Sequence, residues 1–132
     1  MKDIAPAIYC MLIASLLPLL WAWVGKFAGR FKVTDNQNPR AFWANAQGLA
    51  ARAHAVQANS YETLPVFLSA VLIAEYMVVM QWAINRLAIM YIVLRLLYGV
   101  AYVTNQATLR SVLWVLGMAC PILLFVLSVR VG

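Results

Sequence analysis

The chain has 132 residues, of which 65% are hydrophobic and only 11% are charged. An ordinary soluble domain of this size is far less apolar, so the composition indicates an integral membrane protein. The formal net charge is +6, but four basic residues gather in one loop, residues 26–40, instead of spreading over a nucleic-acid-binding surface. We therefore expect membrane lipids, and no nucleic acid, among the partners.

Four apolar stretches follow one another along the chain, at residues 4–24, 56–80, 84–103 and 111–131. A helix of about 20 apolar residues crosses the hydrocarbon core of a bilayer. An alanine-rich segment leads from residue 40 into the second stretch without a proline, so we predict helices over about 4–24, 40–80, 84–104 and 109–131. The short later connections make their helices antiparallel neighbours, which predicts a single-domain, all-α, four-helix transmembrane bundle.

The predicted helix over residues 40–80 is unusually long. Asn38 followed by Pro39 is typical of a helix N-cap and first helical residue. At 1.5 Å per residue the helix would measure about 60 Å, so it must project from the membrane or break. Gly48 and Pro65 are the candidate positions for a break.

The charges of the loops predict the orientation of the bundle. The first loop carries Lys26, Arg30, Lys32 and Arg40, whereas the loop between the second and third predicted helices carries only Arg86. Positively charged loops stay in the cytoplasm, so both termini are expected on the opposite side. The first apolar run has no clear cleavage site, and we predict an uncleaved span of a multi-pass protein, in a bacterial inner membrane.

The two cysteines and the single histidine show no catalytic or metal-binding spacing. Cys10 and Cys120 both fall inside predicted spans and form no C-x-x-C pair, so we interpret them as packing residues. His54 has no other potential ligand at a metal-binding spacing, and we expect no metal.

Polar side chains recur on one face of the second and of the third predicted helix, and one more opens the fourth. They are Arg52, Asn59 and Glu62, then Arg95, Tyr98 and Tyr102, and finally Arg110. Because the helices are antiparallel, most of these residues are expected in one layer near the cytoplasmic surface, with Arg95 deeper. Such a layer could bind a polar, charged ligand while apolar walls below it accept a lipophilic one.

Each of these groups also has a structural interpretation. Glu62 could simply neutralise Arg52 or Arg95, since charges inside a membrane bundle need partners. The tyrosines could pack helices or form an interfacial belt, and Arg110 could anchor a cytoplasmic turn.

Three motifs resemble the MAPEG family, the membrane-associated proteins in eicosanoid and glutathione metabolism. NSYETLPVF, residues 59–67, is similar to the family pattern N-x-x-E followed by P-x-F. RLLYGVAY, residues 95–102, resembles the pattern R-x-x-[H/Y]-x-x-x-Y of the third helix. LRSV, residues 109–112, resembles the start of the fourth helix in microsomal prostaglandin E synthase.

The resemblance implies a homotrimer that binds glutathione as a cosubstrate between helices of adjacent subunits and conjugates or reduces a lipophilic small molecule. Arg110 would stabilise the thiolate. Residues implied to bind glutathione are Arg52, Asn59, Glu62, Arg95, Tyr98 and Tyr102, with Arg30 and Ser111 as further candidates. Family members often carry arginine close before the asparagine, where this chain has Ala55 and Ala58, and Arg52 is the expected substitute.

Two other classes of function remain open. A non-catalytic membrane scaffold or lipid-binding protein could keep the fold, with Arg95 and Glu62 as structural partners. A small proton-coupled exporter could use Glu62, although such an acid usually lies deep in a span.

Overall fold

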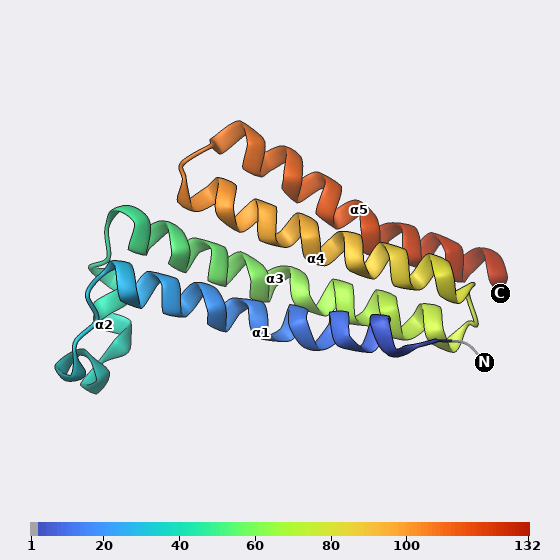
Figure 1. Ribbon diagram of the computed structural model, residues 1–132, viewed down its shortest axis with the longest axis horizontal. Coiled ribbons are helices and arrows are strands. Elements are labelled where there is room, and N and C mark those ends of the chain that lie inside the picture. The colour runs from blue at the N-terminus through green and yellow to red at the C-terminus, as the bar shows by residue number, and fades with distance from the viewer. Residues whose placement is uncertain (1–2) are drawn as a thin grey trace.

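The computed structural model describes residues 3–132, and every regular element in that range is a helix. The four long helices are α1 (Ala5–Ala28), α3 (Gly48–Tyr76), α4 (Gln81–Val103) and α5 (Ala107–Val131). A short 3-10 helix, η1 (Val33–Gln37), and the six-residue α2 (Pro39–Ala44) connect α1 to α3. The long helices lie side by side, with both termini at one end and α2 with the α4–α5 turn at the other (Figure 1).

The segment predicted as one helix over residues 40–80 is divided, which corrects the prediction of a continuous helix. Its first part is α2, which ends at Ala44, and α3 begins at Gly48. Gly48 has a φ of 59°, a left-handed conformation that glycine adopts without steric cost, so the chain changes direction there. Pro65 remains inside α3 and does not end the helix. The break therefore lies at the first of the two candidate positions.

Three helices end with the same backbone motif, in which a residue other than glycine takes a left-handed conformation. These residues are Arg30 after α1, Val78 after α3 and Asn105 after α4, with φ values of 57°, 59° and 61°. The next N–H then bonds back into the last turn, as Gln106 N does to the carbonyl oxygen of Ala101 at 2.8 Å. This arrangement satisfies carbonyl groups that the helix end would leave free.

The core runs along the bundle between the long helices, and α3 contacts each of the other three. Phe67 of α3 and Tyr91 of α4 are both buried, and their rings stack at 4.0 Å with planes 6° apart. Trp21 of α1 lies directly over Gly99 of α4, where any side chain on residue 99 would meet the indole. Cys10 and Cys120 are buried free thiols, packed in the same apolar cluster as Phe67.

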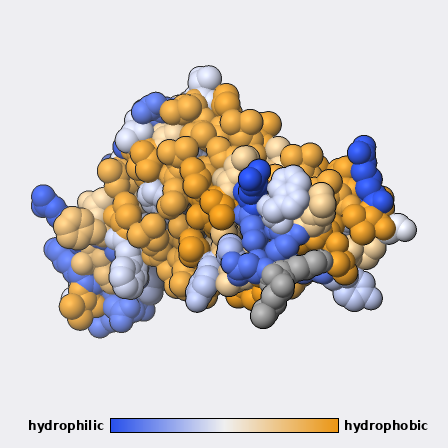
Figure 2. All heavy atoms as spheres, turned by 45° about the vertical axis from the view of Figure 1, so that its right-hand side comes forward, coloured by the Kyte–Doolittle hydropathy of each residue, from blue (hydrophilic) through white to orange (hydrophobic). Residues whose placement is uncertain are grey.

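The outer surface of the bundle is apolar, as a protein embedded in lipid requires. Hydrophobic side chains cover most of the face that Figure 2 presents. Three helices, α1, α4 and α5, are long and apolar enough to cross a membrane. The sequence predicts a fourth span in α3, but the first half of this helix is polar, with Arg52, His54 and Glu62 among its residues. The chain is thus an all-α membrane bundle of three apolar helices and one more polar helix.

Candidate functional site

A hollow of about 380 Å³ lies at the end of the bundle that holds the α4–α5 turn. It is lined by Asn59 of α3, by Tyr98 and Tyr102 of α4, and by Arg110, Ser111, Trp114 and Val115 of α5. The left-handed conformation of Asn105 makes the chain reverse directly after α4, which brings the first turn of α5 beside the last turns of α4. The lining residues of α4 and α5 therefore meet at one site, and the packing of α3 against α5 adds Asn59.

Two tyrosine rings lie between two arginine side chains at this site. The guanidinium of Arg110 lies 4.2 Å from the centre of the Tyr102 ring, and the Tyr102 ring meets the Tyr98 ring edge to face at 5.8 Å. The guanidinium of Arg95 lies 4.4 Å from the centre of the Tyr98 ring. Both cations are thus held against aromatic faces, which attract positive charge.

Arg95 is buried in the interior of the bundle with a neutral partner. It is 3% exposed, and its Nη2 donates a hydrogen bond to Ser60 Oγ at 3.2 Å. Ser60 Oγ in turn donates to the carbonyl oxygen of Val56 at 2.8 Å. One alternative from the sequence was that Glu62 neutralises Arg95. In the structure Glu62 is exposed, and Arg95 donates its hydrogen bond to Ser60 instead.

Two buried polar atoms near the hollow have no hydrogen-bond partner within the described part of the chain. They are Asn59 Oδ1 and Arg95 Nη1. A buried polar group left unpaired costs about 1–3 kcal/mol, so a ligand that donates to Asn59 would recover this free energy. Asn59 lines the hollow itself, whereas Arg95 lies behind Tyr98.

Five of the predicted site residues line the hollow, namely Asn59, Tyr98, Tyr102, Arg110 and Ser111. The other predicted residues lie elsewhere. Half-buried Arg52 donates from Nε to the carbonyl oxygen of Val103 at 3.0 Å and so caps the end of α4. Arg30 is the left-handed residue that ends α1, and exposed Glu62 lies outside the lining of the hollow. The shared helical face predicted for Arg52, Asn59 and Glu62 does not bring the three together within one chain.

Two lining residues and one supporting residue were not predicted. Trp114 and Val115 follow Arg110 and Ser111 by four positions, which places the four side chains on one face of α5. That spacing is visible in the sequence and could have identified both. Ser60 had no such signal, because a serine in a helix usually bonds its own backbone.

An apolar groove adjoins the hollow on the outside of α5. Its volume is about 310 Å³, and it is lined by Ser111, Val112, Val115 and Leu116. Ser111 and Val115 line both spaces. A polar site and a lipophilic surface therefore meet along one helix.

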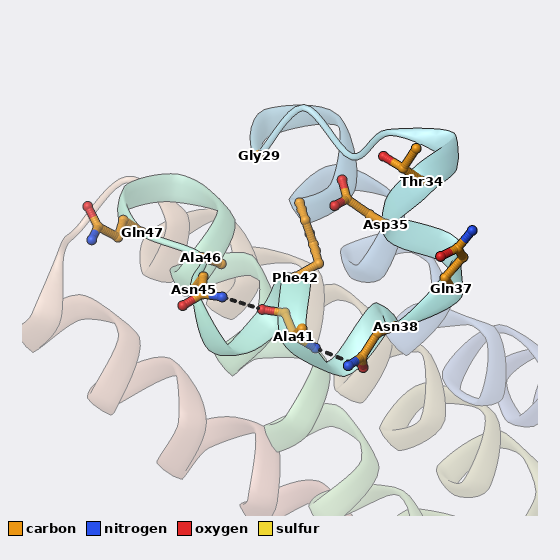
Figure 3. Close-up of a pocket in the computed structure, with 10 residues that line it drawn as sticks. All are labelled: Gly29, Thr34, Asp35, Gln37, Asn38, Ala41, Phe42, Asn45, Ala46 and Gln47. Carbon is orange, nitrogen blue, oxygen red and sulfur yellow. Dashed lines mark hydrogen bonds between the residues drawn. The ribbon is translucent and has the colours of Figure 1, made fainter.

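Another hollow, of about 440 Å³, lies in the segment between α1 and α3 (Figure 3). Three of its polar side chains, those of Asp35, Asn38 and Asn45, hydrogen-bond to the backbone of that segment. Asn38 Oδ1 accepts from Ala41 N at 3.3 Å, and Asn45 Nδ2 donates to the Ala41 carbonyl oxygen at 3.0 Å, as the dashed lines show. Asp35 Oδ2 accepts from Lys32 N at 2.8 Å. These bonds are local, so we assign this hollow no chemistry.

Within residues 3–132, no group of three or more His, Cys, Asp and Glu side chains is placed to hold a metal ion. The hollow of about 380 Å³ that α3, α4 and α5 line, called the α3–α5 hollow below, instead offers arginine, tyrosine and asparagine side chains.

Comparison with known families identifies the chain. The model of the MAPEG family matches residues 6–130, nearly the whole sequence. The chain belongs to the MAPEG family. This is a family of membrane proteins that includes glutathione transferases and proteins with other roles. A search of curated proteins found no match to the chain. Family membership and the apolar helices together make the chain an integral membrane protein.

Proposed function

We propose that this MAPEG protein is a membrane enzyme that uses glutathione to conjugate or reduce a lipophilic electrophile. The observation that carries the proposal is the α3–α5 hollow, which combines the guanidinium of Arg110, the two tyrosines and the buried unpartnered Oδ1 of Asn59. Glutathione is a peptide with amide donors, charged ends and a thiol, and these groups match that set of side chains.

Activation of the thiol is the role proposed for Arg110. A cysteine thiol has a pKa of about 8.5, so it is mostly protonated at neutral pH, whereas the thiolate is the nucleophile. Lowering that pKa to about 6.5 requires about 2.7 kcal/mol of preferential interaction with the anion. One guanidinium at a poorly hydrated site can supply this free energy. Because Arg110 rests on the Tyr102 ring, its N–H donors can turn toward the sulfur.

The rest of the peptide would be held by polar groups around the thiol. Asn59 is proposed to accept an amide N–H, and Tyr98 and Tyr102 to donate from their hydroxyls. Glu62 suits an ammonium group, and because it is exposed, it would act on glutathione bound to a neighbouring subunit of a homotrimer. Arg95 and Arg52 would then support Tyr98 and the end of α4, as their contacts suggest.

The groove on α5 is the proposed entrance for the lipophilic substrate. It begins at Ser111 and Val115 and continues to Leu116. In a transfer reaction the thiolate sulfur would form a bond to the electrophilic carbon, and the bond from that carbon to a leaving group would break, with its electron pair leaving on that group. In a peroxidase reaction two glutathione molecules would reduce a hydroperoxide to an alcohol and water and form glutathione disulfide.

One observation favours the second candidate, a non-catalytic scaffold or lipid-binding protein. Among residues 3–132, Arg110 is the one cation that lines the hollow, and Ala55 and Ala58 stand where relatives often carry arginine. Recognition of the two glutathione carboxylates is therefore the weakest part of the fit, more so than activation of the thiol.

Stopped-flow ultraviolet absorbance tests the proposal directly. Mixing glutathione with the purified protein should produce the absorbance of a thiolate, and Arg110→Ala should abolish it while leaving the helix content unchanged. Arg86→Ala, which removes an exposed arginine from the turn region at the other end, is the matched control. If millimolar glutathione neither gives this signal nor raises the melting temperature, the glutathione proposal is wrong.

A further inference from the structure

A separate hollow of about 430 Å³ lies between α2 and α3. It is lined by Arg40, Trp43 and Ala44 of α2 and by His54 of α3. The Trp43 and His54 rings stack at 4.5 Å with planes 14° apart. It shares no lining residue with the hollow lined by α3, α4 and α5, so the two hollows are separate.

The position of Trp43 relates this hollow to the surface of the membrane. Trp43 packs so closely on Gly25 of α1 that a Cβ atom added at Gly25 would lie 2.7 Å from its ring. Gly25 lies in the last turn of α1, which ends at Ala28 and is apolar enough to cross the bilayer. Trp43 is therefore held against the last turn of a helix that can cross the membrane, and tryptophan is enriched where such helices meet the membrane surface.

The short α2 is held there by a series of aromatic contacts. Phe31 meets Phe42 edge to face at 4.9 Å, and Phe42 meets Trp43 at 5.0 Å. The Lys26 Nζ lies 4.5 Å from the centre of the Phe31 ring. The hollow is thus part of a packed segment.

The loop that leads into α2 is positively charged. Residues 26–40 contain four basic residues and one acid, Asp35, a net charge of 4 − 1 = +3. Asp35 already accepts a bond from the Lys32 backbone, and exposed Arg40 lines the hollow. Anionic lipids attract basic segments at the membrane surface, and guanidinium donors match the oxygens of a phosphate.

We propose that this hollow binds the headgroup of an anionic phospholipid. Arg40 pairs with the phosphate, while the stacked Trp43 and His54 rings form the wall against which the glycerol backbone packs. The bound lipid fixes α2 against the ends of α1 and α3. This site does not depend on the glutathione proposal, since neither its residues nor its ligand are shared.

Native mass spectrometry of the detergent-purified protein tests this proposal. The protein is mixed with equal amounts of phosphatidylglycerol and phosphatidylcholine that have the same acyl chains. We expect preferential retention of phosphatidylglycerol, and Arg40→Ala should reduce the retained amount about fivefold. Arg40→Lys, which keeps the charge without the fork of donors, should give an intermediate value.

Arg86→Ala is the matched control, because the Arg86 guanidinium also lies near a tryptophan, 5.3 Å from the Trp82 ring centre. Both residues lie in the first turns of α4, which begins at the end of the bundle opposite α2 (Figure 1). The lipid retention of Arg86→Ala should equal that of the wild type. An equal loss for the two variants would show that only bulk charge attracts lipid and would overturn the proposal. So would equal retention of both lipids, or displacement of phosphatidylglycerol by inorganic phosphate, which would identify a free-anion site.

Discussion

At the scale of single residues, the site is organised by contacts between cations and rings and not by ion pairs. Arg95, Tyr98, Tyr102 and Arg110 follow one another in space, each within 6 Å of the next. A carboxylate partner would occupy the donors of an arginine, whereas an aromatic face leaves them available. Arg110 is therefore both oriented and free to bind an anion.

Replacements of Tyr102 separate its ring from its hydroxyl. Tyr102→Phe keeps the ring beneath Arg110, whereas Tyr102→Leu removes a contact worth about 1 kcal/mol. We expect the leucine variant to lose most of the thiolate absorbance at a fixed glutathione concentration and the phenylalanine variant to keep it. Equal losses in the two variants would instead assign the function of Tyr102 to its hydroxyl.

Ser60 is expected to matter for stability because it receives the hydrogen bond of a buried cation. Ser60→Ala should lower the free energy of unfolding in detergent by about 1.5–3 kcal/mol, the usual value of a bond to a charged group. The control is Ser69→Ala on the same helix, where an exposed hydroxyl bonds only the Pro65 carbonyl. Chemical denaturation followed by circular dichroism measures both, and a similar change in the two variants would contradict this role.

At the scale of helices, the backbone conformation at the end of each helix determines how the next helix packs and so which side chains lie together. The left-handed Asn105 ends α4 and sets α5 against it, and asparagine tolerates that conformation well. Val78 takes the same conformation at the end of α3, although it is β-branched and 61% exposed. A branched residue there is strained, so the α3–α4 turn is held by the helices on either side of it.

Val78→Gly should stabilise the protein, which few substitutions do. A left-handed residue with a Cβ costs about 1–2 kcal/mol, and glycine avoids this cost while losing part of the gain to its greater freedom in the unfolded chain. We expect a net increase of about 1 kcal/mol in the free energy of unfolding. Val93→Gly, at an exposed position inside α4, should destabilise the protein, and a loss of stability in both variants would exclude strain at Val78.

Helix periodicity and turn length predicted much of this arrangement. The contacts that they did not predict show what such patterns leave undetermined. Tyr98, Tyr102 and Arg110 were predictable because a short turn forces the ends of adjacent helices together. The contact of Arg52 was not predictable, because the position of a residue on a helix face does not show which neighbouring helix that face packs against. In the structure Arg52 donates a hydrogen bond to the end of α4. The roles of the predicted site residues remain predictions.

At the scale of the whole molecule, the bundle has two chemically different ends. Both termini lie at one end, with the α3–α4 turn, and η1, α2 and the α4–α5 turn lie at the other (Figure 1). The basic loop of residues 26–40, the hollow lined by α3, α4 and α5, and the hollow between α2 and α3 thus belong to the same end. With α1, α4 and α5 crossing the membrane, the two proposed ligands would both bind at one surface.

Labelling of single cysteines tests this arrangement in intact cells. Cys10 and Cys120 are buried and can be replaced by alanine, and new cysteines can be placed at exposed Thr34, Met80 and Thr108. Because loops rich in lysine and arginine stay in the cytoplasm, a reagent that does not cross membranes should label only Met80→Cys. If Thr34→Cys and Thr108→Cys were labelled from opposite sides of the membrane, the arrangement of the bundle would be contradicted, because it places both positions at the same end.

The polar first half of α3 has a consequence for how the protein is made. Synthesis proceeds from the N-terminus, so when α3 leaves the ribosome only α1 is available to shield Arg52, Ser60 and their neighbours from lipid. Arg95 arrives later, in α4, and its hydrogen bond to Ser60 can form only once both helices are in place. Stable insertion of α3 therefore waits for α4, and a ribosome stalled between the two would leave α3 the easiest helix to extract from the bilayer.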